Sequence, residues 1–108
     1  MKANYINTLY VYLARMVFMA IDEIKLTKIR EKLKALLIEN LSLEDIEPEE
    51  IADDEILFDE GLGLDSLDAV EIVVLLQRNF NIDVKDAQKA REVFYSLETL
   101  TKFVYDNT

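Results

Sequence analysis

The residue that could best do chemistry in this sequence is Ser66, because its hydroxyl group lies between a glycine-containing turn and a predicted helix. The only two glycines, Gly61 and Gly63, fall just before it, and no glycine or proline follows it. Glycine permits sharp turns and close backbone approach, so the pattern predicts a turn that delivers the hydroxyl to the start of a helix. A group attached there is exposed, held on a rigid element, and close to unpaired helix N–H groups that favour an anion.

The composition argues against Ser66 as an enzyme nucleophile. A serine hydrolase needs a base, usually histidine, to take the hydroxyl proton, and the chain has neither histidine nor cysteine. The residues Leu64-Asp65-Ser66-Leu67 resemble the Gly-Asp-Ser-Leu motif of certain esterases only superficially. The nearby acidic residues lack the ligand spacing of a calcium loop. We therefore predict no catalytic residue and no dedicated metal site, and the choice for Ser66 lies between a plain helix cap and an attachment point.

The residues around Ser66 resemble the acyl carrier proteins of fatty acid and polyketide synthesis. The matching residues are Leu62-Gly63-Leu64-Asp65-Ser66-Leu67-Asp68, followed by Val70-Glu71 and Phe80. In that family the serine of the Asp-Ser-Leu triplet carries 4'-phosphopantetheine, which comes from coenzyme A. The resemblance, from roughly Ile21 to the C-terminus, implies that Ser66 is the attachment site and that acyl groups are held as thioesters on the arm. An unmodified helical adaptor of the same fold, acting only by protein binding, is the alternative.

Acidic residues surround the motif. The net charge is −10, and from Glu39 to Glu71 every charged side chain is acidic. The plain interpretation is a solvated acidic loop, but such a surface also repels nucleic acid and anionic membranes and attracts basic protein surfaces. The resemblance implies as partners a phosphopantetheinyl transferase and acyl-loading, condensing and acyl-modifying enzymes with basic docking surfaces. The contact residues that we expect are Asp65, Leu67, Asp68, Val70, Glu71 and Val74.

One part of the sequence departs from the family pattern. Where many acyl carriers continue with acidic residues, this chain has Gln77 and Arg78, followed by Lys85, Lys89 and Arg91. The later half of the expected docking face is therefore less acidic than usual. This favours a dedicated carrier for a specialised pathway over one for general fatty acid synthesis.

The apolar spacing predicts an all-α fold, an acyl-carrier-like bundle of three long helices plus a short third helix, with a long loop between helices one and two. We expect helices at about residues 22–41, 66–79 and 85–93, a last helix capped by Ser96, and a helical turn near residues 48–52. The stripe of the second helix that should face the core consists of Ala69, Ile72, Val73, Leu76 and Phe80. Leu67, Val70 and Val74 form a second stripe, which is a contact surface unless it is simply buried.

Residues 1–18 are predicted to be an appendage, a tail or short helix, outside a carrier domain of residues 19–108. The segment is apolar, but Asn4, Asn7, Thr8 and Arg15 interrupt it, so it does not resemble a membrane span, and no clear signal-peptide cleavage site follows. It could dock on the domain or on a membrane surface, or Met19 could be the original start. We expect a cytoplasmic monomer without stable membrane insertion, although an ordered segment would have to cover its tyrosines, for instance by self-association.

Overall fold

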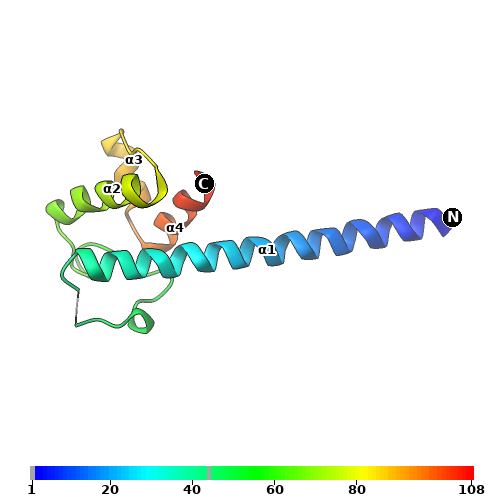
Figure 1. Cartoon of the computed structure of the whole chain (residues 1–108), viewed down its shortest axis with the longest axis horizontal. Coiled ribbons are helices and arrows are strands. Elements are labelled where there is room, and N and C mark those ends of the chain that lie inside the picture. Colours follow the sequence, from blue (N-terminus) through cyan, green and yellow to red (C-terminus); the bar gives the residue numbers. More distant parts are fainter. Residues whose placement is uncertain (1, 44) are drawn as a thin grey trace.

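The computed structural model describes residues 2–43 and 45–108, and it confirms the all-α fold. The elements, in order, are α1 (Lys2–Asn40), the 3-10 helix η1 (Pro48–Glu50), α2 (Ser66–Phe80), α3 (Ala87–Val93) and α4 (Leu97–Asp106). Figure 1 shows a small body of helices from which the N-terminal half of α1 projects as a straight rod. The molecule therefore measures 62 × 30 × 23 Å.

The core lies where the C-terminal half of α1 meets α2, α4 and the long connection. α1 packs against α4, η1 and α2, and α3 packs against α4. The side chains that are almost completely removed from solvent come from all of these parts: Leu37, Ile51, Leu57, Ile72, Leu76, Leu97, Leu100 and Val104. The inward stripe predicted for α2 is confirmed, since Ile72 and Leu76 are buried and Ala69, Val73 and Phe80 are half-buried against the core.

The predicted start of the first helix near Asp22 is wrong, because α1 begins at Lys2 and runs without a break to Asn40. No glycine or proline interrupts this stretch, so the backbone has no reason to leave the helix at Asp22. The Asp22 carboxylate does not cap a helix but accepts a hydrogen bond from the Tyr105 hydroxyl of α4. Between residues 6 and 25 every side chain is exposed except half-buried Ala14. Packing of α1 against the body starts with half-buried Leu26 and buried Ile29.

The other helices match the prediction closely. α2 begins at Ser66 as expected, and α4 follows a Ser96 cap whose side chain accepts from the Thr99 N–H. α3 is shorter than predicted because Asp86 caps it and the helix starts at Ala87. None of the helices in the described part of the chain has a stretch both long and apolar enough to cross a membrane.

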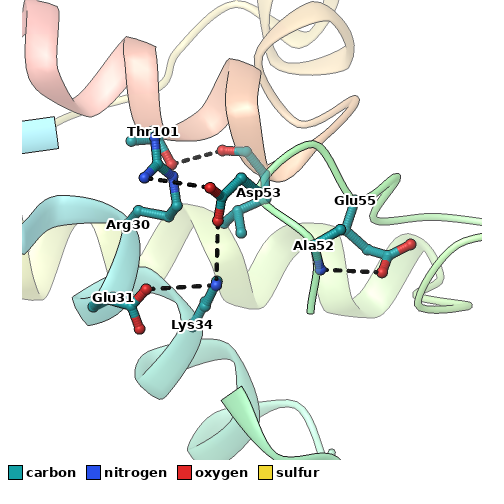
Figure 2. A network of polar contacts seen from close by, with 8 residues as sticks. Arg30, Glu31, Lys34, Ala52, Asp53, Glu55 and Thr101 are labelled. Atoms are coloured by element: carbon teal, nitrogen blue, oxygen red, sulfur yellow. Dashed lines mark hydrogen bonds and ion pairs between the residues drawn. The ribbon is translucent and has the colours of Figure 1, made fainter. Parts of the chain in front are cut away.

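The long connection between α1 and α2 is attached to α1 and to the short segment between α3 and α4. Leu57 is fully buried, and its N–H donates to the Tyr95 carbonyl at 3.2 Å. Figure 2 shows the second attachment, in which Asp53 lies between Arg30 and Lys34 of α1. The distances from the Asp53 carboxylate oxygens are 3.6 Å to Arg30 and 3.4 Å to Lys34. Because Lys34 is only 5% exposed, this ion pair neutralises a cation that burial would otherwise penalise.

Candidate functional site

The turn before α2 requires both glycines. A Cβ at Gly61 would lie 1.6 Å from the carbonyl oxygen of Ile56, so the connection crosses itself too closely for any side chain. Gly63 has a φ of 74°, a left-handed conformation that L-residues adopt only with strain. The Leu64 N–H then donates to the Leu57 carbonyl at 3.1 Å and fixes the turn to the buried part of the loop. Ser66 is therefore placed by backbone contacts, as the glycine pattern predicted.

The start of α2 is closed by a capping box that the sequence interpretation missed. The Asp65 carboxylate accepts from the N–H groups of Leu67 and Asp68 at 3.0 and 3.1 Å, and the Asp65 N–H donates to the Asp68 carboxylate at 2.9 Å. The spacing Asp65-x-x-Asp68 before an apolar run was the signal. The expectation of unpaired N–H groups around Ser66 is corrected accordingly, since Asp65 occupies two of them.

This cap determines the electrostatic setting of the Ser66 side chain. Ser66 is the first helical residue, is exposed, and lies between the two capping carboxylates in sequence. Among the described residues its hydroxyl makes no hydrogen bond. An anionic group attached there would be repelled by Asp65 and Asp68, so the helix start favours an attached group that extends away from the helix.

A groove of about 980 Å³ opens beside Ser66 and runs between the start of α2, the connection and α3. Its apolar lining comes from Ile56, Phe58, Leu64, Ala69, Val70, Val73, Val84, Ala90, Phe94 and Tyr95. This volume lies within the range of ordinary ligand pockets. The sequence indicated Phe58 as part of the core, and the structure places it half-buried, packed against the core on one side and lining the groove on the other.

Both signs of charge border this groove. Asp59, Glu60 and Asp65 lie along the edge formed by the connection and the start of α2, whereas Lys85 and Arg91 come from α3 and the residues before it. Asp86, next to Lys85, also lines the groove, so the side formed by α3 carries both signs of charge whereas the connection and the start of α2 contribute only acidic groups. Lys85 and Arg91 are two of the four basic residues by which the sequence departs from the family pattern.

The structure places the predicted contact residues on and around one face at the start of α2. Leu67 and Val70 are 80% and 62% exposed, which are high values for large apolar side chains. Val74, in contrast, is half-buried, so the exposed apolar stripe is shorter than predicted. Asp65 is exposed, while Asp68 and Glu71 are half-buried at its edge. An apolar centre with an acidic rim is the usual composition of a modest, salt-sensitive interface.

Comparison with known proteins agrees with this geometry. The family described as "Phosphopantetheine attachment site" matches residues 31–102, which is more than half of the chain. The acyl carrier protein of Onion yellows phytoplasma (strain OY-M) is 35% identical over 78 residues, covering 72% of this chain and 95% of that protein. The chain belongs to the acyl carrier protein family. Acyl carrier proteins are carriers and not catalysts, and they hold a covalently attached 4'-phosphopantetheine arm.

The residues at the start of α2 fit such an arm. An acyl carrier protein needs an accessible hydroxyl on a rigid element, and Ser66 provides one at the opening of the groove. When attached, the arm supplies a terminal thiol that holds acyl groups as thioesters. Because this chain has no cysteine, it contributes no thiol of its own and leaves that chemistry to the arm.

Proposed function

We propose that Ser66 carries the 4'-phosphopantetheine arm of this acyl carrier protein. The supporting observation is the exposed Ser66 hydroxyl at the first position of α2, beside an apolar groove of about 980 Å³. The position of this hydroxyl is fixed by the turn at Gly61 and Gly63 and by the Asp65 cap, none of which forms a hydrogen bond with it in the described part of the chain. The carrier then presents acyl groups to enzymes of fatty acid, polyketide or related specialised biosynthesis.

The apolar groove gives the acyl group a place between enzymes. An alkyl chain extending from the arm gains free energy when it leaves water, at about 0.8 kcal/mol for each buried CH₂. Val73 and Phe94 belong to the groove lining and connect it with the core. We propose that the acyl chain rests there and leaves when a partner enzyme docks.

The intact mass of the protein tests the attachment site. The full chain is incubated with coenzyme A, magnesium and a broad-specificity phosphopantetheinyl transferase, and we expect a gain of one arm. Ser66→Ala should abolish the gain and leave the far-UV circular dichroism unchanged, because this hydroxyl makes no hydrogen bond within the described residues. The control, Ser42→Gly, keeps Ser66 and suits the positive φ of 59° at residue 42, so it should be loaded at the normal rate. No gain with several transferases would favour the unmodified adaptor.

The partner surface that we propose is the acidic and apolar face around Leu67, Val70 and Glu71. The transferase and the acyl-loading, condensing and acyl-modifying enzymes would meet it with basic docking surfaces. Lys85 and Arg91 at the other side of the groove favour partners that also present acidic groups, and hence a specialised pathway. We further propose that the carrier acts in the cytoplasm, where coenzyme A supplies the arm, and that residues 19–108 form the carrier domain with residues 1–18 as a helical appendage.

Reversing one charge tests this face. Glu71→Lys should slow loading by the transferase about tenfold, because it places a cation where a basic partner docks. Glu23→Lys is the matched control, since it makes the same change of net charge at an exposed position on α1 far along the sequence from Ser66. Equal loading rates for the two variants would mean that the contact face lies elsewhere.

A further inference from the structure

The projecting half of α1 exposes an apolar surface that the carrier function does not use. We call residues 6–24 of α1 the rod. Twelve large apolar side chains of the rod are each between 51% and 74% exposed. Together they expose roughly 1,000 Å² of apolar surface, which exceeds the 300–600 Å² of the largest patch on a typical monomer.

The body of the molecule does not cover this surface, because large apolar side chains lie on all sides of the rod and packing against the body begins only at Leu26. Thr8, Arg15 and Asp22 are spaced by seven residues, about two helical turns, and the next position in this series is the core residue Ile29. A neighbouring series, Tyr12 and Met19, continues through Leu26 to the core residue Leu33, so the side of α1 that packs on the body is partly polar and partly apolar along the rod. The continuation of the opposite side, through Tyr10, Val17 and Ile24, arrives at exposed Glu31.

The apolar positions on this outer side follow a regular spacing. Six exposed residues are separated alternately by four and three residues, and we call them the seam: Ile6, Tyr10, Leu13, Val17, Ala20 and Ile24. A repeat of this kind averages 3.5 residues and is typical of helices that pair with another helix. The spacing also reads the same in both directions about residue 15. An antiparallel neighbour of identical sequence would therefore meet the seam with Ile6 opposite Ile24, Tyr10 opposite Ala20, and Leu13 opposite Val17.

We propose that two copies of this chain pair antiparallel through the seam. The pair has two-fold symmetry, so each copy contributes the same surface. The seam contains five of the twelve large apolar side chains of the rod, and Leu9 and Ile21 flank it on the helix, so pairing would cover more than half of them. A stable interface buries ~800 Å² on each partner. This proposal replaces the monomer that the sequence predicted for the carrier domain.

The distribution of charge favours the antiparallel arrangement. All acidic residues of the chain lie at or after Asp22, so the two bodies repel each other if they are placed side by side. An antiparallel pair separates them by the length of the rod, about 28 Å, which is well beyond the Debye length of ~10 Å. Between residues 6 and 21 the only charged residue is Arg15, so the paired segments themselves meet without repulsion.

The same charges argue against a membrane as the partner that covers the apolar surface of the rod. Helices that lie on membranes usually carry several lysines and arginines on the polar side. The rod has Arg15 alone between residues 6 and 21, and the chain as a whole has a net charge of −10. An anionic bilayer would repel the body that the rod has to bring with it.

Analytical ultracentrifugation of the full chain tests the pairing. We expect twice the chain mass of 12.5 kDa. Val17→Glu places a charge in the seam and should weaken the dimer at least tenfold. Val11→Glu is the matched control, because Val11 is on the same helix and similarly exposed, at 51% against 57%, but lies outside the seam. Glutamate is a good helix former, so both variants should keep the helical circular dichroism.

Cysteine pairs test the orientation, without background because the chain has no cysteine. Mixing Leu13→Cys with Val17→Cys under oxidising conditions should give the mixed disulfide in preference to either same-position disulfide. A monomeric mass across the micromolar range would overturn the proposal. So would a monomer that floats with phosphatidylcholine vesicles, equal masses for Val17→Glu and Val11→Glu, or predominant same-position disulfides.

Discussion

At the scale of single residues, the position of the reactive hydroxyl depends on two glycines with different roles. Gly61 is required because the connection passes directly over the Ile56 carbonyl, where a Cβ would lie 1.6 Å from the oxygen. Gly63 is required for its backbone conformation, and a Cβ there would meet nothing closer than the Asp59 carbonyl at 3.8 Å. A steric requirement cannot be relieved without moving the backbone, whereas a conformational one costs a limited amount.

We therefore expect the two alanine substitutions to differ. Gly63→Ala should lower the free energy of unfolding by about 1–2 kcal/mol, the cost of a left-handed L-residue. Gly61→Ala should cost clearly more, since the crossing with Ile56 has to open. Urea unfolding followed by circular dichroism measures both, and loading of Ser66 by a transferase should fall more for Gly61→Ala. Equal losses for the two variants would show that the close crossing does not constrain the loop.

The cap at Asp65 shows what could be predicted at the residue scale and what could not. The sequence indicated Ser66 as the first residue of a helix, and the structure confirms this position. Asp65 was interpreted only as a partner contact, although it also closes the helix start. The spacing Asp65-x-x-Asp68 was sufficient to predict the cap. The partial burial of Val74, in contrast, depends on how α2 packs on its neighbours and could not be predicted from periodicity alone.

At the scale of elements, the contact between α1 and α4 is completed by Tyr105. Its hydroxyl donates to the Asp22 carboxylate, and Lys25 lies 4.9 Å from the centre of its ring. The hydrogen bond to Asp22 is the main reason that the pKa of Tyr105 is raised above 10.0, and the negative charges of Asp22 and Asp106 add to it. This contact secures the end of the chain near the point where the rod leaves the body.

The raised pKa predicts how this contact responds to alkaline pH. A group whose pKa is higher in the folded state stabilises the fold fully below its unfolded pKa of about 10, and this contribution is lost as the pH rises through the folded pKa. Wild type should therefore be more stable than Tyr105→Phe by a constant amount up to about pH 9, and the difference should shrink above pH 10. Chemical unfolding at a series of pH values measures this difference. A difference that stays constant to the highest pH would contradict the role of the phenol proton.

The helices themselves were largely predictable, and the exception has a physical cause. For α2 and α4 the apolar period and the caps at Asp65 and Ser96 agree with each other. In α1, Asp22 has the residue type of a cap but lies within a stretch of good helix formers, and nothing before it breaks the helix.

At the scale of the whole molecule, the rod lies outside the packed body, since no residue from 6 to 25 is buried. The described interactions that attach α1 to α4 include those of Asp22 and Lys25, and packing of α1 against the body starts with half-buried Leu26. The body therefore has its full core without residues 1–18. We expect a chain of residues 19–108 to keep the helical fold of the body and to accept one arm at the rate of the full chain.

Intact mass and sedimentation together measure this expectation. The shortened chain should be loaded normally and should sediment as a monomer, because it retains only two of the six seam positions. If the shortened chain kept its fold but was no longer loaded, the first eighteen residues would be required for attachment of the arm.

Because α1 is one uninterrupted helix, the direction in which each rod side chain points is fixed relative to the body. A helix transmits rotation along its axis, so one residue inserted between Ile24 and Leu26 would turn the outer half by about 100° relative to the body, while seven inserted residues would nearly restore the original direction. In the proposed pair, the number of residues between Ile24 and Ile29 would therefore decide in which direction the second body points. In the proposed pair, length polymorphism at this junction would re-aim one Ser66 relative to the other, and among the contacts described above it would disturb the one between Asp22 and Tyr105.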